Sequence, residues 1–471
     1  MYNHSMNHRI IPITLFVCLS AATAQAQVEV RKEAPPEIRQ LISAVVQAVN
    51  GTAENFETFA QERFAPELLK KQSPADRAAL HRKLSDNFGQ IAVGAVRREG
   101  PDAPLQLQVK GSKSNGVIVI DVDSAAKILE FSSEDPAAAA TAGPGGLPRP
   151  PIDGSLTSDE IDRRLSDYFG KLAADDVFSG VALVARNGVP VFFKAYGMAD
   201  REKKIPNTIH TRFNLGSINK GFTQAAIRQL VAAGKLSMTD TVGKFFPDYP
   251  QSVTRSATIE QLMTHRAGVS DFFGAEFNNA PKSGFASNAD YFRFVSSRPP
   301  TFAPGERSQY CNGCYIALGA IIEKVSGMPY EKYMAENVFR RAEMTSTGYL
   351  RSDRPEPDIA IGYTRRSTGT ALQAPRPSSP QDLQRNTEMH GVSGSAAGGG
   401  YSTALDLLTY VKAVRAGKFP GVDPGMGIAG GAPGINAILE TRGEWTVIVL
   451  TNFDPPTGQQ LGVAIADALT R

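Results

Sequence analysis

The sequence predicts two folded units of different class: a small α+β unit, and a larger unit in which helices flank an antiparallel sheet that carries an inserted helical subdomain. Three observations predict this division. Residues 28–135 show helical and then alternating patterns, and two hairpin patterns enclose a helical region in 156–471. Between them, residues 136–155 are so rich in Pro, Ala and Gly that they cannot form a core, and we interpret them as a linker.

Length and composition exclude several classes of protein. The 471 residues are enough for more than one domain, and 42% hydrophobic with 21% charged residues fits neither a disordered nor a polytopic membrane protein. The 50 Lys and Arg residues nearly balance the 47 Asp and Glu residues, and no run of like charge could follow a phosphate backbone. We therefore expect no nucleic-acid partner.

The first 26 residues are typical of a secretory signal peptide. Arg9 precedes a mostly apolar stretch at 10–22, and Ala24-Gln25-Ala26 has the small-x-small pattern of a cleavage site. This stretch is too short to cross a bilayer about 30 Å thick, so we expect no stable membrane anchor. The sequence predicts a periplasmic or secreted protein, cleaved near Ala26.

Residues 28–135 have the pattern of a small accessory domain. Apolar residues at helical spacing predict a helix at 37–49, and a second helical stretch covers 74–88. Alternating runs at 105–109 and 117–122 predict two strands joined by a polar turn. Helices followed by a curled sheet resemble the cone-shaped fold of the nuclear-transport-factor-2-like family, and we find no catalytic constellation in this segment.

Two hairpins are predicted near the ends of the larger unit. Asn187-Gly188 and Arg442-Gly443 each separate two strand-like runs, and the first pair is a strong turn signal. An amphipathic helix is predicted at 459–469, and helical patterns dominate the middle of the unit. This arrangement favours one sheet built from both ends of the unit, with a cleft between the sheet and the inserted helices.

Cys311 and Cys314 are the two cysteines that follow the signal peptide. An oxidising compartment allows a disulfide between them, while two free, buried cysteines fit the pattern as well. Two sulfur ligands are too few for a structural zinc site, and no histidine cluster stands nearby in the sequence. We leave the disulfide open and expect neither a metal nor another cofactor.

Ser217-Ile218-Asn219-Lys220 forms an S-x-x-K tetrad at the start of a predicted helix. Three residues make nearly one helical turn, so the serine and the lysine would share a face within hydrogen-bond reach. A serine hydroxyl becomes a good nucleophile when a base takes its proton, and a buried lysine of lowered pKa can be that base. By itself the tetrad also fits an N-cap serine followed by a solvated lysine.

Several longer segments carry a family resemblance. Residues 304–315 read PGERSQYCNGCY and precede GAIIEKVSG at 319–327, while TIEQLMTHRAG stands at 258–268 and GGGYSTALD at 398–406. In this order, and together with S-x-x-K, they resemble the serine beta-lactamase superfamily, in its branch of class C beta-lactamase-like enzymes, D-aminopeptidases and esterases. The resemblance covers about residues 160–471 and leaves the first third unexplained.

The resemblance implies an acyl-enzyme mechanism. Ser217 would be the acylated nucleophile and Lys220 its proton partner, and Tyr310 would pass a proton between Lys220 and the leaving group. Asn312 would contact the substrate amide or hold Lys220. The backbone amide of Gly431 would be the second oxyanion donor, because this role needs no side chain. Whether Lys220 or Tyr310 is the acylation base stays open.

One position departs from the family pattern. The basic residue expected on the strand that borders the site is replaced by Ile428, so a partner for a substrate carboxylate is missing unless another cation, such as Arg266, reaches that spot. His265 is expected to be a packing residue. The leading hypothesis is an exported serine hydrolase that acts on a small ester, amide or D-amino-acid peptide. The alternatives are a beta-lactamase and a non-catalytic member that binds peptidoglycan or a protein.

Overall fold

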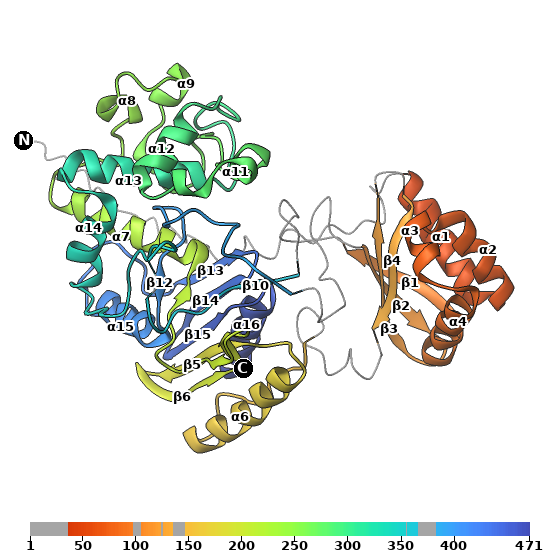
Figure 1. Cartoon of the computed structure of the whole chain (residues 1–471). Helices are drawn as coiled ribbons and strands as arrows, with labels where there is room; N and C mark the ends of the chain where they lie inside the picture. The colour runs from red at the N-terminus through yellow and green to blue at the C-terminus, as the bar shows by residue number, and fades with distance from the viewer. Residues whose placement is uncertain (1–35, 98–104, 124–125, 135–146, 355, 366–382) are drawn as a thin grey trace, which may run out of the picture. The chain divides into compact units, whose positions relative to one another are not determined.

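The computed structural model of the chain describes residues 36–97, 105–123, 126–134, 147–354, 356–365 and 383–471 (Figure 1). The expected signal peptide at 1–26 and the first part of the expected linker lie outside the described residues. The chain divides into two compact units, Met1–Ala140 and Thr141–Arg471.

The first unit places four helices before a four-stranded antiparallel sheet of order β1-β2-β3-β4. The helices are α1 (Pro36–Asn50), α2 (Ala53–Arg63), α3 (Pro66–Lys71) and α4 (Pro74–Phe88). The strands are β1 (Ile91–Arg97), β2 (Leu105–Gly111), β3 (Asn115–Val122) and β4 (Ile128–Glu134). Helix and sheet residues such as Phe56, Leu107 and Ile118 share one buried core, so the α+β class predicted for this segment is confirmed.

The second unit is built around a five-stranded antiparallel sheet of order β13-β14-β15-β5-β6. Its strands are β5 (Gly180–Arg186), β6 (Val189–Tyr196), β13 (Gly427–Ala432), β14 (Ile435–Arg442) and β15 (Trp445–Thr451). Because β15 pairs with β5 along its whole length, the two ends of the unit form one sheet, as predicted. Asn187 and Gly188 make the β5–β6 turn with φ values of 52° and 77°, the left-handed conformation that a tight two-residue hairpin requires.

Helices cover both faces of this sheet (Figure 1). Helices α6 (Ser158–Ala174) and α16 (Thr457–Leu469) pack on one face, where Phe169 and Val184 belong to the same buried core. Helices α7 (Asn219–Ala232) and α15 (Ala404–Arg415) pack on the other, where Phe222 and Leu183 belong to a second core. Successive strand residues therefore enter different cores, which explains why the central strands are apolar almost throughout. Ile152, from the expected linker, is buried in the first of these cores.

A helical region is inserted between the two parts of the sheet, and most of it lies at the top of Figure 1. It contains α8 (Val242–Phe245), α9 (Ser252–Arg255), α10 (Ile259–Met263), α11 (Ala275–Asn279), α12 (Asn288–Ser296), α13 (Asn312–Ser326) and α14 (Tyr330–Met334). Helix α13 is buried from its first residue to Ile322 and contacts α7, α10 and α12. It therefore brings residues at its own N-terminus close to those at the start of α7.

Short strands and turns connect these parts. The strand pairs are β7 (Met198–Asp200) with β8 (Ile205–Pro206), β9 (Phe213–Asn214) with β12 (Tyr401–Ser402), and β10 (Tyr363–Thr364) with β11 (Gln384–Arg385). The pairing of β9 with β12 places the residues just before Ser217 beside the segment that precedes β12. Both segments contribute to the candidate site.

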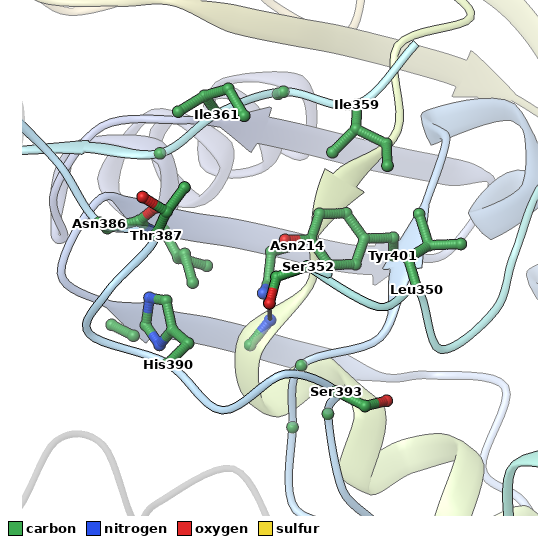
Figure 2. A pocket seen from close by; sticks show the side chains of 18 of the residues that line it. Asn214, Leu350, Ser352, Ile359, Ile361, Asn386, Thr387, His390, Ser393 and Tyr401 are labelled. Carbon is green, nitrogen blue, oxygen red and sulfur yellow. Dashed lines mark hydrogen bonds between the residues drawn. The ribbon is translucent and has the colours of Figure 1, made fainter. Parts of the chain in front are cut away.

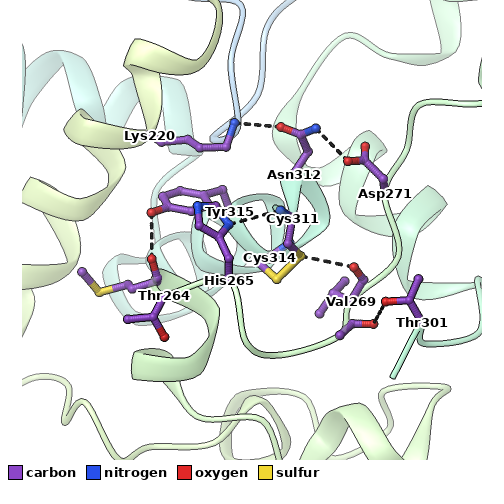
Figure 3. The surroundings of a disulfide bond; sticks show 12 residues. Lys220, Thr264, His265, Val269, Asp271, Thr301, Cys311, Asn312, Cys314 and Tyr315 are labelled. Atoms are coloured by element: carbon purple, nitrogen blue, oxygen red, sulfur yellow. Dashed lines mark hydrogen bonds between the residues drawn. A yellow bond between two sulfur atoms is a disulfide. The ribbon is translucent and has the colours of Figure 1, made fainter. Parts of the chain in front are cut away.

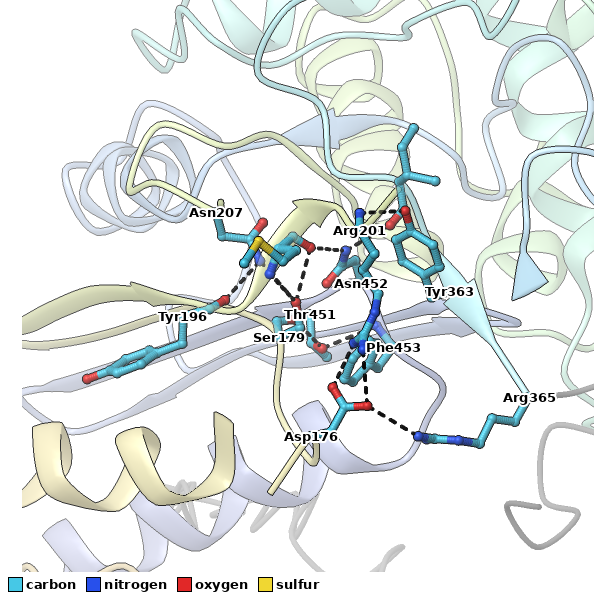
Figure 4. Close-up of polar contacts among 12 residues, drawn as sticks. Asp176, Ser179, Tyr196, Arg201, Asn207, Tyr363, Arg365, Thr451, Asn452 and Phe453 are labelled. Atoms are coloured by element: carbon cyan, nitrogen blue, oxygen red, sulfur yellow. Dashed lines mark hydrogen bonds and ion pairs between the residues drawn. The ribbon is translucent and has the colours of Figure 1, made fainter. Parts of the chain in front are cut away.

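A polar network fastens the segment before β10 to the end of the sheet (Figure 4). Asn452 is buried, and its Nδ2 donates to the carbonyl oxygens of Met198 at 2.9 Å and Ile361 at 2.8 Å. The hydroxyl of Tyr363 accepts the backbone N–H of Arg201 at 2.7 Å. In this segment, side chains provide hydrogen bonds to backbone groups that a regular helix or sheet would otherwise satisfy. They hold in place one wall of the pocket described below.

Each described cluster of buried apolar residues belongs to one of the two units. We therefore expect residues 141–471, produced alone, to fold and to unfold cooperatively at the temperature at which the same unit unfolds in residues 28–471. Calorimetry of both proteins measures this. A fragment that is unfolded, or that melts more than about 5 °C lower, would show that the first unit stabilises the second.

Candidate active site

Ser217 lies in a single 3-10 turn, Gly216–Ile218, that leads directly into α7. The Oδ1 atom of Asn214 accepts the N–H of Gly216 at 2.9 Å, and Gly216 has a left-handed φ of 49°. The apolar residues of α7 are buried below, as the helical spacing predicted. The serine is therefore half-exposed at the N-terminal end of an anchored helix, where the helix dipole favours a developing negative charge.

Lys220 is one turn further along α7 and is almost completely buried, with 5% of its surface exposed. Its Nζ lies 3.0 Å from Ser217 Oγ, 2.7 Å from Asn312 Oδ1 and 2.6 Å from the carbonyl oxygen of Ala397. Loss of solvation lowers the pKa of Lys220 to about 7, and the carboxylate of Asp271 opposes part of this change. An amine with a pKa near neutrality can accept a proton as well as donate one.

The hydroxyl of Tyr310 lies 2.5 Å from Ser217 Oγ. The Tyr310 ring centroid is 4.8 Å from the Nζ of Lys220, and the ring stacks on that of His265. Loss of solvation around the hydroxyl raises the pKa of Tyr310 above the ordinary phenol value, even though 56% of the residue's surface is exposed. The phenol is therefore protonated at neutral pH, which makes Lys220 the better candidate for the acylation base.

His265 holds the turn that carries Tyr310. Its Nδ1 accepts the N–H of Cys311 at 3.1 Å, and its carbonyl oxygen accepts the N–H of Gln309 at 3.0 Å. Burial, and secondly the charge of Lys220, lower the pKa of His265, so the imidazole is neutral and carries its proton on Nε2. These contacts on both sides of Tyr310 favour the packing role expected for this histidine.

Asn312 is the first residue of α13 and is bonded on two sides (Figure 3). Its Oδ1 faces Lys220, and its Nδ2 donates to Asp271 Oδ2 at 2.7 Å. Cys311 and Cys314, on either side of it in the sequence, form a disulfide, which was one of the two alternatives for this pair. The disulfide closes a very short loop that contains Asn312, so it stiffens the backbone that carries this amide.

The strand β13 brings Gly431 to the nucleophile. A Cβ atom on the neighbouring Gly430 would lie 1.9 Å from the carbonyl oxygen of Leu215 and 2.8 Å from the nitrogen of Ser217, so the close approach of strand and turn requires glycine here. Ser217 and Gly431 both line the pocket described next. Their backbone amides are the candidate pair of donors for an oxyanion.

The site opens into a cavity of about 540 Å³. Figure 2 shows Ile359 and Tyr401 on one side of it and Asn386, Thr387 and His390 on the other. Phe272 and Phe273 also line it, so both apolar and polar side chains form its walls. Within the described residues, no group of three or more His, Cys, Asp or Glu side chains could hold a metal ion.

Ile428 and Arg266 do not supply a cation to this cavity. Ile428 packs against α7, where a Cβ atom on Gly221 would lie 2.9 Å from its Cδ1, and it is absent from the described cavity wall. The guanidinium of Arg266 donates to the carbonyl oxygen of Gly305 at 2.8 Å on an exposed part of the chain. The exception that the sequence left for Arg266 therefore finds no support in its position.

Sequence reasoning missed three groups at the site. Asp271 follows the segment 258–268 by three residues, but a lone carboxylate after a motif is an unspecific signal. The carbonyl of Ala397 carries no signal at all, since any residue offers one. His390 lines the cavity, and burial lowers its pKa to about 4, with a backbone hydrogen bond to Pro433 opposing this change. A single histidine has no characteristic spacing, so the sequence gives no signal for this position.

The segments that form the candidate site are also found in known proteins. A model of the beta-lactamase family matches residues 165–421, more than half of the chain, and this range includes Ser217, Lys220, Tyr310 and Asn312. The chain belongs to the beta-lactamase family. The resemblance inferred from the sequence is thereby confirmed, as is the fold predicted for this part: an antiparallel sheet flanked by helices with an inserted helical subdomain.

Individual relatives of this beta-lactamase family member extend the comparison. The PbpX protein of Bacillus subtilis (strain 168) is 31% identical over 260 residues, which are 55% of this chain and 60% of PbpX, so the match spans less than two thirds of that relative. A solved penicillin-binding protein from Bacillus halodurans is 27% identical with a TM-score of 0.55, covering 63% of this chain and 99% of its own. The D-amino acid amidase of Ochrobactrum anthropi SV3 is 20% identical with a TM-score of 0.53, covering 64% of this chain and 97% of its own, and shares the fold.

The disulfide gives the first prediction on this site. Residues 27–471, isolated from an oxidising compartment without reductant and then denatured, should contain no thiol that iodoacetamide alkylates, and two after reduction. Intact mass and peptide mapping to Cys311 and Cys314 measure this. The double variant Cys311→Ala/Cys314→Ala should lose only about 2 kcal/mol of stability, because so short a loop removes little entropy from the unfolded chain. Two alkylated thiols before reduction would contradict the pairing.

Proposed function

We propose that this beta-lactamase family member is an exported serine hydrolase that cleaves an ester or amide through an acyl-enzyme on Ser217. The observation that carries the proposal is the bonded cluster in which Ser217 Oγ contacts both the buried amine of Lys220 and the hydroxyl of Tyr310. A solvated lysine beside an N-cap serine would not need burial or acceptors from two other segments. The cluster therefore favours catalysis over a purely binding role for peptidoglycan or a protein.

The proposed reaction begins with Lys220 as the neutral amine. As Ser217 Oγ attacks the substrate carbonyl, its proton passes to Lys220 Nζ, and the oxyanion is bound by the amides of Ser217 and Gly431. Tyr310 then gives its proton to the leaving alcohol or amine and recovers one from Lys220, which leaves the acyl-enzyme and a neutral amine. Water enters where the leaving group departed, and the same groups run the steps in reverse to release the acid.

Export is the second part of the proposal. The segment 1–26 has the composition of a signal peptide, and a disulfide between Cys311 and Cys314 is typical of proteins that mature outside the cytosol. Among the residues that the structure describes, no helix has the length and apolar character needed to cross a membrane. We infer a periplasmic or secreted location after cleavage near Ala26.

The proposed substrate class follows from the positive charges that the cavity offers to a substrate carboxylate. Penicillins and C-terminal D-Ala peptides carry a carboxylate, and a charge-assisted hydrogen bond to it contributes roughly 1.5–3 kcal/mol. Ile428 offers no such bond. Among the described cations of the cavity wall, Lys203, Arg351 and Arg385 already have acidic partners, and Arg354 lies on an exposed loop. Neutral substrates, such as short-chain esters and capped amides, therefore fit the site better than beta-lactams.

Covalent labelling tests the nucleophile. A fluorophosphonate probe should add one mass equivalent to the peptide that contains Ser217. Ser217→Ala and Lys220→Ala should each reduce turnover by roughly a thousandfold or more, and the double variant should be little worse, because both residues serve one step. Ser256→Ala, on an exposed turn, is the control and should label normally. Labelling that survives Ser217→Ala would remove this serine from the proposal.

Steady-state kinetics test the substrate class. We expect kcat/KM to be higher for a p-nitrophenyl ester than for nitrocefin or a D-Ala-D-Ala peptide. Because Ile428 packs against α7 and is absent from the described cavity wall, Ile428→His should leave this ranking unchanged. The assignment of specificity is wrong if nitrocefin or the D-Ala-D-Ala peptide is the better wild-type substrate.

A further inference from the structure

The amide of Asn312 has its oxygen toward Lys220 and its nitrogen toward Asp271. A carboxylate can only accept hydrogen bonds, so the group that faces it must be the amide nitrogen, the donor end of the side chain. The oxygen is then left for Lys220. The orientation of an amide that contacts the proposed base is thus decided by a residue that does not touch the nucleophile.

Asp271 is itself held in place by its neighbours. Its Oδ1 accepts the backbone N–H of Phe273 at 3.1 Å, so both carboxylate oxygens are engaged. Its carbonyl oxygen accepts a hydrogen bond from the guanidinium of Arg298 at 2.6 Å, and Arg298 in turn pairs with Glu276. These bonds fix the carboxylate relative to α13, so it can act as a rigid support.

We infer that Asp271 is a positioning residue that holds the Asn312 amide with its oxygen toward Lys220, so that Lys220 presents its lone pair to Ser217. The inference rests on the proposed serine hydrolase function and goes one step further into its site. It assigns Asp271 a role that acts through Asn312, without contact to the substrate or to the reacting atoms.

The direction of the Lys220 lone pair follows from the number of hydrogen-bond donors on the neutral amine. A neutral lysine has two N–H groups and one lone pair, and Nζ has three oxygen neighbours. Two of these, the Asn312 amide oxygen and the Ala397 carbonyl, can only accept, so they take both N–H groups. The lone pair remains for the hydroxyl of Ser217. A flipped Asn312 would instead point its nitrogen at Lys220 and compete with the serine for the lone pair.

Asp271 also adds charge to the surroundings of Lys220. The other groups that face the amine are uncharged at neutral pH: the hydroxyl of Ser217, the Tyr310 and Tyr315 rings at 4.8 and 5.5 Å, and the neutral His265. The Asp271 carboxylate raises the pKa of Lys220 against the larger effect of burial. Removal of this charge should therefore lower the pKa of Lys220.

The test is the pH dependence of kcat/KM for a p-nitrophenyl ester. Activity requires neutral Lys220, so the rate falls as the pH drops through the pKa of that amine, which is about 7 in the free enzyme. In Asp271→Asn this fall should move to lower pH, and the plateau rate should drop about tenfold because one acceptor is lost and the amide of Asn312 is released. A residue needed only for folding would lower the rate without moving the pH profile.

Two further variants keep the result interpretable. Glu260→Gln removes an exposed carboxylate of α10 that belongs neither to the contacts of Asp271 nor to the described cavity wall, and it should leave the profile unchanged. If Asp271 acts through Asn312, the plateau value of kcat/KM should fall as much in Asn312→Ala alone as in the double variant Asp271→Asn/Asn312→Ala. This comparison remains valid if Asp271→Asn is less stable, provided that melting curves show folded protein.

The outcomes separate the inference from the function on which it rests. Wild-type protein that takes no fluorophosphonate label would refute the serine hydrolase function. Normal labelling, together with an Asp271→Asn profile and plateau equal to wild type, would refute the role of Asp271 and leave the hydrolase intact. Additive losses in the double variant would place the action of Asp271 elsewhere than on Asn312.

Discussion

A buried amine needs a hydrogen-bond partner in every direction from which water has been removed, and the site of this protein is arranged around that requirement for Lys220. Its partners come from three separate places: Ser217 in the turn that leads into α7, Asn312 on α13, and Ala397 in the segment before β12. Burial of the amine is unfavourable by itself, and these contacts offset it. They do not compensate fully for the lost solvation of the charged form, so the pKa of Lys220 is lowered to about 7. The amine can therefore exchange protons at neutral pH.

Two further features of the site are constrained at the backbone. Helix α13 must bring its N-terminus to α7, so it is buried over most of its length, and its first turn is stiffened by the disulfide around Asn312. The edge strand β13 must approach Ser217 closely enough for two amides to converge, so Gly430 cannot carry a side chain. In both cases the constraint acts on the backbone.

How much of this could be predicted depends on whether the signal is local. The Asn187-Gly188 turn is dictated by the two residues that form it, and Ser217 and Lys220 are neighbours because they are one helical turn apart, so both were predicted from the sequence. The family motifs indicated Tyr310 and Asn312, although nothing local brings them to α7. Asp271 lies 41 residues before Asn312, and their contact exists through tertiary packing alone. The burial of Ile152 was missed for the same reason, because its Pro-rich surroundings indicate a linker.

The sheet of the second unit closes between strands that are distant in the sequence: the hydroxyl of Thr451 donates to the carbonyl of Ser179, 272 residues earlier. A chain that emerges from the ribosome in order therefore cannot complete its central sheet until the last strand has been synthesised, and closing so long a loop is slow. The amide of Gly431 reaches Ser217 at this same late stage. The candidate site is therefore assembled only after most of the chain has been synthesised.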